Sequence, residues 1–295
     1  MSDKEKFNVY KAVTQNIVLR LAEGDIPWRK PWCSPIGDGK INYVSRKPYH
    51  GVNLLLLTQG GEYLTFKQAL DAGGNVRKGE HGTLVFKWIP FIPKDRKEEA
   101  ERLEAAGLST SHLQAFKTGW DKVFHLSQTE NIATKIEQSG YKRSDKPTDI
   151  ARFVIERYME QHGAALDERP CDEVTYDTAT GIHTVPLRGQ FRQEESWYES
   201  VFGLIVRSAS EKIREQGEAP RPADRKDTVK KELAEAIGAA MCMAAVGLEN
   251  RLTREETAAE CARWTAEFNR DYTLVVQASA AAEKAARYIL RPITE

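Results

Sequence analysis

The stretch SWYESVFGLIVRSASEKI, residues 196–213, gives the clearest starting point for working out the fold of the chain. Ser196 and Glu199 have the spacing of a capping box, in which the two side chains bond backbone N–H groups at the start of a helix. A helix is therefore predicted over this stretch. Asp227 and Asp271 are the expected N-caps of two later helices. The predicted downstream helices cover residues 228–248, 253–268 and 272–290. The second of these helices begins at a capping box of its own.

Upstream of residue 196, the signals for strands and turns become stronger. A helix is predicted over 149–162, where Gly163 ends it, and a hairpin over 172–186 with Gly181 in its turn. The polar stretch 139–148 contains Gly and Pro and is the expected domain boundary.

The first half of the chain mixes short helices with strands. Apolar residues at helical spacing predict a helix over 7–23, and Gly73 and Gly74 close a short helix in the stretch 63–74. Strands are expected within 76–91 and 123–130, separated by the charged segment 94–118, which we interpret as a solvated insertion. We therefore expect two α+β domains, over residues 1–138 and 147–295.

Composition limits the classes of protein to consider. A 295-residue chain with 41% hydrophobic and 29% charged residues is typical of globular domains, and its formal net charge is zero. Residues 1–90 hold 13 Lys and Arg against 8 Asp and Glu, so the N-terminal end is basic and the remainder is acidic. This distribution argues against a DNA mimic, which needs a dense acidic face.

Several features point to a protein of the cytoplasm. The four cysteines lack metal-site spacing, so free thiols in a reducing compartment are expected. No signal peptide is predicted, and the longest apolar run, 236–248, is too short to cross a bilayer, so no membrane partner is expected. Motifs for a nucleophilic serine, a phosphate loop or a His-Glu-x-x-His zinc site are absent, and we interpret His183 as a half-buried structural residue.

Basic and aromatic residues alternate in the loops of the first half. Proteins that bind single-stranded nucleic acid use such residues, because cations contact the phosphates and flat side chains stack on unpaired bases. An alternative interpretation is that the tryptophans pack in the core or in loops and that the lysines form a solvated face. The candidate DNA-binding residues are Trp28, Arg29, Lys30, Trp32, Lys40, Asn42, Arg46, Lys47, Tyr49, Lys67, Arg77, Lys78, His81 and Lys87.

The first half resembles a known family. The segments IPWRKPW, SRKPYHGVNLLLL, YLTFKQALDAGGNVRKGEHGTLVFKW and VFHLSQTE are similar, in order and spacing, to the N-terminal domain of ArdC-type antirestriction proteins, and related domains occur in plasmid TraC-type primases. The resemblance covers about residues 5–131. It implies a single-stranded-DNA-binding α+β domain, and so favours the functional interpretation of the basic and aromatic cluster.

In the second half, the segments DEVTYDTATGIHTVPLRGQF, SWYESVFGLIVRS and KKELAEAIGAAMCMAAVGL resemble the zincin-like metallopeptidase domain of the same family, over about residues 150–290. The family's active helix carries His-Glu-x-x-His, and alignment on Trp197 and Tyr198 puts Gly203, Leu204 and Arg207 at the first ligand, the general base and the second ligand. Such zinc sites need two imidazoles one helical turn apart and a third ligand. Glycine, leucine and a permanently charged arginine supply none of these, so we expect no peptidase activity and no cofactor.

A third-ligand position survives in the following helix. The resemblance implies that Glu235 occupies it, with Glu232 as the alternative. Arg207 can take the place of the cation and pair with Glu235, or it can simply point to solvent. A less orthodox possibility is a metallopeptidase in which Glu235 and neighbouring acidic residues bind zinc or another divalent metal.

The resemblance therefore implies an antirestriction function. We expect the chain to bind single-stranded DNA and to protect incoming plasmid DNA during conjugation, with a degenerate metallopeptidase domain. A host restriction or conjugation protein is a further candidate partner.

Overall fold

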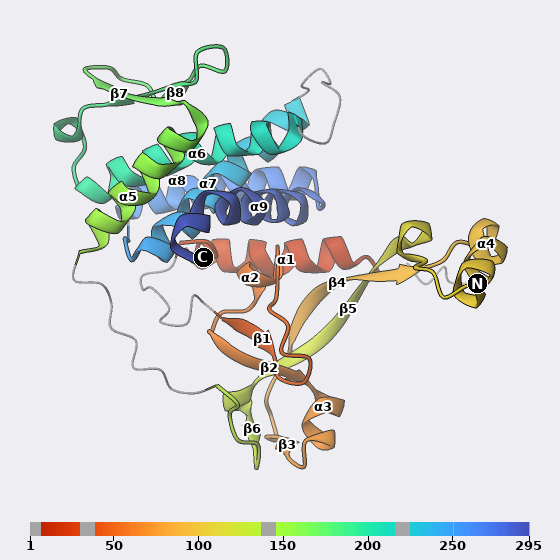
Figure 1. Ribbon diagram of the computed structural model, residues 1–295. Coiled ribbons are helices and arrows are strands. Elements are labelled where there is room, and N and C mark those ends of the chain that lie inside the picture. Colours follow the sequence, from red (N-terminus) through yellow and green to blue (C-terminus); the bar gives the residue numbers. More distant parts are fainter. Residues whose placement is uncertain (1–6, 30–38, 137–145, 216–224, 250, 295) are drawn as a thin grey trace.

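The computed structural model describes residues 7–29, 39–136, 146–215, 225–249 and 251–294. A small mixed sheet occupies one side of the molecule and a helical bundle the other, and helix α1 (Val9–Ala22) runs between them (Figure 1). The two-domain α+β architecture expected from the sequence is confirmed. The expected boundary at 139–148 falls mostly on residues outside those described.

The first half is built around a four-stranded sheet. Its strand order is β1-β2-β5-β4, and β1 pairs parallel with β2 while the other pairs are antiparallel. The short strands β3 (Asn75–Val76) and β6 (Thr129–Glu130) form a separate pair. The sheet strands are β1 (Lys40–Asn42), β2 (Gly61–Thr65), β4 (Thr83–Phe91) and β5 (Ala115–His125), and the small helices are α2 (Asn53–Leu56) and α3 (Phe66–Asp71).

Strands β4 and β5 form a two-stranded ribbon that extends well beyond the other strands (Figure 1). Thr83 pairs with Val123 at its base and Phe91 with Ala115 at its outer end. Helix α4 (Lys97–Ala105) lies at the tip, between the two strands in sequence. The segment 94–118, expected as an insertion, thus forms this tip and includes the first residues of β5.

The second half is a helical bundle with a small sheet on one side. The sheet has the order β7-β9-β8, and the pairing of β8 with β9 confirms the hairpin predicted around Gly181. Its strands are β7 (Ala165–Arg169), β8 (Thr175–Tyr176) and β9 (Ile182–Pro186). The helices are α5 (Pro147–His162), α6 (Glu194–Glu215), α7 (Arg225–Val246), α8 (Arg254–Arg270) and α9 (Leu274–Thr294).

One hydrophobic core connects the two halves. Val13, Ile17 and Leu21 of α1 are buried in the same cluster as Trp264 of α8 and Ile237 of α7. A second cluster, inside the bundle, joins α5, α6, α7 and α9. Because α1 buries apolar side chains against the bundle and also against α2 and β4, the N-terminal helix is shared by the two halves in packing.

Local signals predicted the elements unevenly. The capping box of Thr253 and Glu256 is present at the start of α8. The capping box predicted for Ser196 was wrong, because α6 already begins at Glu194, and the two acidic residues there favour a helix start. Asp227 likewise lies inside the first turn of α7. Asp271 is the C-cap of α8, and its Oδ1 also accepts the backbone N–H of Thr273 at 2.8 Å directly before α9, as expected of a capping residue. No helix in the described part of the chain is long and apolar enough to cross a membrane.

Candidate nucleic-acid interface and altered metal-site helix

The structure separates the predicted DNA-binding residues into structural and exposed groups. Trp28 belongs to the first, because its side chain is 6% exposed and lies in the core. Its ring meets Trp264 and Phe268 edge to face, with centroids 6.2 and 6.5 Å apart, and its indole N–H donates to Glu260 Oε1 at 3.3 Å. The ring is therefore not available to a base, and the core-packing interpretation holds at this position. Lys30 and Trp32 lie outside the described residues.

Arg29 is also occupied within the protein. Its guanidinium bonds Glu199 Oε1 of α6 at 2.7 Å and Glu260 Oε2 of α8 at 3.0 Å. Burial opposes its charge, but the two carboxylates outweigh burial and raise the pKa of Arg29 above its ordinary value. Arg29 thus fastens its loop to two helices of the bundle and does not present its charge to DNA.

Lys40 and Tyr49 support the sheet from within. Lys40 is buried, and its Nζ donates to the carbonyl oxygen of Leu54 at 2.6 Å. Tyr49 is half-buried against Tyr63, with ring centroids 6.0 Å apart, and burial raises the pKa of its phenol. A phosphate cannot reach the buried Lys40 ammonium, so its predicted DNA contact is corrected to a structural role.

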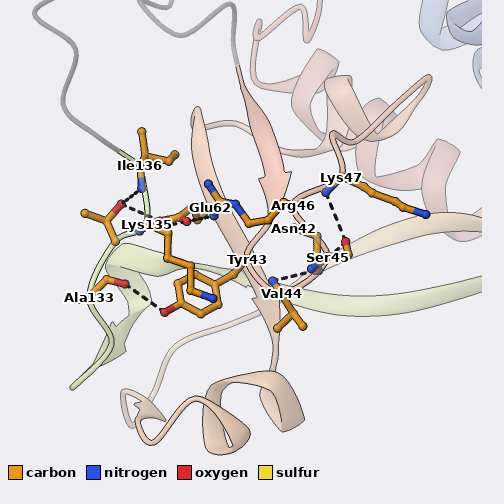
Figure 2. Close-up of polar contacts among 11 residues, drawn as sticks. Asn42, Tyr43, Val44, Ser45, Arg46, Lys47, Glu62, Ala133, Lys135 and Ile136 are labelled. Atoms are coloured by element: carbon orange, nitrogen blue, oxygen red, sulfur yellow. Dashed lines mark hydrogen bonds and ion pairs between the residues drawn. The ribbon is translucent and has the colours of Figure 1, made fainter.

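Asn42 and Arg46 organise the turn that follows β1, as Figure 2 shows. Asn42 Oδ1 accepts the backbone N–H groups of Val44 at 3.1 Å and Ser45 at 2.9 Å. Arg46 has a left-handed φ of 57°, and its guanidinium forms an ion pair with the buried Glu62. The turn therefore has a fixed shape, in which Asn42 and Arg46 act as supports.

Glu62 is the centre of this support (Figure 2). It accepts Thr134 Oγ1 at 2.7 Å and the backbone N–H of Lys135 at 3.0 Å, besides the Arg46 pair. Burial opposes its ionisation, but these donors together lower the pKa of Glu62 below its usual range. The Lys135 ammonium lies 4.0 Å from the ring centroid of Tyr43, so this cation is also engaged within the protein.

The remaining predicted residues are on the outside of the first half. Lys47, Lys67, Lys78 and His81 are exposed, on the turn after β1, on α3 and on the turn before β4. Two further cations have carboxylate partners, with Arg77 bonded to Glu80 at 2.8 Å and Lys87 to Asp121 at 2.7 Å. The exposed group is the part of the prediction that can meet a polyanion.

Exposed aromatic residues on the β4–β5 ribbon were not among the predicted site residues. Trp88, Phe116 and Trp120 all have large exposed side chains. A sequence signal does exist, because Phe86, Trp88 and Pro90 alternate along β4 and Phe116, Thr118 and Trp120 along β5. Recognising it requires the register between two strands that are separated by a long insertion.

Helix α6 carries Gly203, Leu204 and Arg207, the residues at the positions that the resemblance assigns to the metal site, and it lies close to α7. Gly238 of α7 allows this approach, since a Cβ at that position would lie 2.8 Å from Val206 Cγ1. Arg207 follows Val206 on α6, and its Nε donates to Glu235 Oε1 at 2.9 Å. Of the two alternatives for Arg207, the ion pair with Glu235 is the one that the structure shows.

The electrostatics of this pair follow from its partial burial. Burial raises the pKa of Glu235 above its ordinary value, and the Arg207 guanidinium opposes that shift without cancelling it. Glu232, the alternative ligand position, forms its own ion pair with Arg263 of α8. Both candidate carboxylates are therefore bonded to arginines.

The residues at this site do not fit a catalytic metal. The Arg207 guanidinium is itself a cation, and it is already bonded to Glu235, the carboxylate that a metal would need. Leu204 is buried and has no atom that could bind a metal or accept a proton. Gly203 offers no ligand atom, although a Cβ there would meet nothing within 4 Å. Across the described ranges, no three His, Cys, Asp or Glu side chains are grouped so that they could hold a metal ion.

A buried polar network lies beside Arg207 and was not predicted. Ser208 Oγ is 2.9 Å from His183 Nε2 and 2.8 Å from the hydroxyl of Tyr158. His183 Nδ1 donates to the carbonyl of Gly181 at 3.1 Å, which leaves Nε2 to accept a hydrogen bond. Burial lowers the pKa of His183, so the ring is neutral near pH 7. The network ties α6 to α5 and β9, and His183 is fully buried where half burial was expected.

Comparison with known proteins gives matches in both halves. Residues 7–120 match the N-terminal domain of anti-restriction factor ArdC, and residues 154–281 match the zincin-like metallopeptidase family. Two DNA primases TraC of Escherichia coli are 26% and 24% identical over 98% and 95% of this chain. The chain spans only 20% and 27% of the length of these two relatives.

The chain is also similar to a further curated protein and to solved structures. Uncharacterized protein y4eC of Sinorhizobium fredii is 36% identical over 34% of this chain and 39% of its own length. Crystal structures of antirestriction protein ArdC from plasmid R388, one Mn(II)-bound and one metal-free, share the fold with a TM-score of 0.68 at 22% identity. These alignments cover 97% and 98% of this chain and 98% of ArdC. This chain therefore has the two-domain architecture of the ArdC antirestriction proteins, an ArdC N-terminal domain followed by a zincin-like domain.

Proposed function

We propose that this chain is a cytoplasmic antirestriction protein that binds single-stranded DNA and protects incoming plasmid DNA during conjugation. Its zincin-like half, whose described residues include no metal-binding set of ligands, serves as a scaffold. The proposal is supported by the match of residues 7–120 to the ArdC N-terminal domain and by the exposed cations of that domain.

The observation that carries the proposal is a set of cations without carboxylate partners. Lys47, Lys67, Lys78 and Lys122 are exposed, and among the residues that the structure describes none of them forms an ion pair. The side-chain amides of Asn42 and Gln68 lie 3.2 Å apart, which joins the turn carrying Lys47 to the helix carrying Lys67. Lysines without internal partners can neutralise phosphates at little cost and release condensed counterions.

The other exposed residues of the predicted set have supporting roles in this proposal. Arg77 and His81 are near Lys78 in sequence and Lys87 lies on β4, and the ion pairs of Arg77 and Lys87 are exposed enough to exchange a carboxylate for a phosphate. Asn42, Arg46 and Tyr49 shape the surface from beneath. Trp28, Arg29 and Lys40 hold the fold.

The test is fluorescence anisotropy of labelled single- and double-stranded oligonucleotides of equal length, titrated with the full chain at two salt concentrations. We expect the single strand to bind more tightly and its affinity to fall steeply with salt. Replacing three lysines by alanine should lower the slope of log affinity against log salt by about 2, since each phosphate contact on a single strand contributes about 0.7. The variant carries Lys47→Ala, Lys67→Ala and Lys78→Ala.

A matched control removes the same charge from the second half. Its three substitutions are Lys231→Ala, Arg254→Ala and Lys284→Ala. The control should keep the wild-type salt slope if the first half binds the DNA. Equal slopes in all three proteins, or equal affinity for single and double strands, would refute the proposal.

The scaffold role of the second half has a separate test. Purified chain incubated with Zn²⁺ or Mn²⁺ should show no proteolysis of a casein substrate, with and without single-stranded DNA. Proteolysis that disappears in Glu235→Ala would establish the alternative, a metallopeptidase with unorthodox ligands.

A further inference from the structure

The proposed lysine contacts do not explain why the β4–β5 ribbon carries exposed aromatic residues. We infer that Trp88, Phe116 and Trp120, here called the aromatic row, stack on unpaired bases of the single strand. This inference rests on the proposed function, because it assigns the base contacts of the same DNA-binding half.

The strand register puts the aromatic row on one face of the ribbon. Phe116 is opposite Pro90, and Trp120 is opposite Phe86, two residues along from Trp88. Residues that pair directly across antiparallel strands share a face, and so do alternate residues of one strand. The side chains of Trp88, Phe116 and Trp120 are 54%, 59% and 43% exposed. Three large aromatic side chains therefore face water side by side along about 14 Å of ribbon.

The base of this face is anchored in the core. Phe86 is buried, with its ring centroid 5.3 Å from that of Tyr10 in α1 and 5.2 Å from that of Trp88. Phe7, which precedes α1, lies 5.2 Å from the ring of Trp120. Rings held in this way lose little conformational freedom when a ligand stacks on them, which favours binding.

The charge on this face suits a polyanion. Its side chains include Lys122, which pairs with Leu84 at the base of the ribbon, and no carboxylate. Asp121 points to the opposite face, where it bonds Lys87 at 2.7 Å. An acidic ligand can thus approach the aromatic row without meeting a negative side chain on the ribbon.

The aromatic row is close in sequence to one of the exposed lysines. Lys78 lies five residues before β4 begins at Thr83, so a strand whose phosphates contact Lys78 can reach the ribbon with its next nucleotides. Bases in a duplex are already stacked and paired, so only a single strand can offer free base faces to the row. The aromatic row thereby supplies the preference for single strands, and the lysines supply the salt-dependent affinity.

The experiment compares two labelled oligonucleotides with the same backbone, an oligothymidylate of about 12 nucleotides and a strand of equal length whose sugars lack bases. Wild-type chain should bind the thymidylate strand more tightly. In Trp88→Ala and in Trp120→Ala, affinity for that strand should fall about 5-fold to 150-fold, because stacking on one aromatic side chain is worth about 1–3 kcal/mol. Affinity for the strand without bases should change less than 2-fold.

Two matched controls separate stacking from folding. Phe153→Ala removes an aromatic side chain of similar exposure from α5 and should leave both affinities unchanged. Trp88→Phe keeps a flat ring and should retain most of the affinity, and it also removes a fluorophore whose quenching by thymidylate reports stacking directly. Urea unfolding of each variant shows whether the fold is retained.

The outcomes separate the two proposals. If wild-type chain binds neither strand, the proposed function fails and this inference fails with it. If wild-type chain binds single strands and the triple variant Trp88→Ala, Phe116→Ala, Trp120→Ala binds equally well, only the aromatic row is refuted. Light scattering compares the molar mass of the triple variant with that of wild type. If the variant has a lower molar mass and an unchanged DNA affinity, this face is a contact between copies of the chain, and the inference is refuted.

Discussion

The Arg207–Glu235 pair gives the sharpest prediction, because its burial lies between two well-measured cases. Removing one partner of a fully buried ion pair costs about 3–5 kcal/mol, whereas an exposed pair is worth about 0–1 kcal/mol. The side chains of Arg207 and Glu235 are 40% and 22% exposed. We therefore expect Arg207→Met, which keeps the length of the side chain and removes its charge, to lower the free energy of unfolding by about 1–2 kcal/mol at pH 7.5.

The pH dependence of this loss identifies its cause. The folded-state pKa of Glu235 already lies above its ordinary 4.5, so ionisation of this carboxyl reduces stability as the pH rises through the folded pKa. Without the Arg207 guanidinium, that pKa rises further. The cost of Arg207→Met should therefore be nearly absent below pH 4.5, where the carboxyl is protonated in both states, and grow between pH 5 and pH 7.5.

The assay is urea unfolding followed by circular dichroism, at pH 4 and pH 7.5, for wild type and variant. The double variant Arg207→Met, Glu235→Gln should recover much of the loss at pH 7.5, because it leaves no unpaired charge. Arg152→Met breaks a more exposed pair with Asp149 in α5 and should cost less than about 0.5 kcal/mol. An Arg207→Met cost that is equal at both pH values would refute the electrostatic account.

The other predictions concern the core, the buried histidine and the metal site. Trp28→Ala should lower the unfolding free energy by about 3–5 kcal/mol while the folded fraction keeps its DNA affinity, and affinity lost without stability would contradict the core assignment. His183 has a pKa below its ordinary 6.5, so the unfolded chain takes up a proton there that the folded chain resists. The free energy of unfolding should fall as the pH drops from 7 to 5, and it should fall less in His183→Gln than in wild type. Equal slopes of this free energy against pH in the two proteins would exclude His183 as the cause. Gly203→His with Arg207→His should create a zinc site with Glu235, seen as about one Zn²⁺ per chain in equilibrium dialysis where wild type retains none.

Local sequence patterns predicted a substantial share of the fold. The Thr253 capping box and the turn at Gly181 depend on residues a few positions apart, and both are present. The pairing of Arg207 with Glu235 was one of two alternatives that the family resemblance left open, and the structure shows it. Such features are decided by short-range geometry or by a family pattern of fixed spacing.

Long-range contacts decided the features that the sequence did not reveal. Trp28 has the neighbours of a stacking residue in sequence, but its environment is set by Glu260, 232 positions away. Trp88 and Trp120 were not selected, because their common face depends on a strand register across the segment 94–118. A charge or an aromatic ring in a loop becomes a binding residue only when the rest of the fold leaves it uncovered.

The position of α1 has a consequence for dividing this protein. Its apolar stripe completes the core that α7, α8 and α9 begin, so the first half carries a piece that the second half needs to fold. Expressed alone, a fragment starting at residue 146 should expose that core and aggregate. Co-expressed with residues 1–136 as a separate chain, it should be rescued as a soluble complex. The two halves would then behave as a split protein, reassembled by a helix that crosses from one fragment into the other.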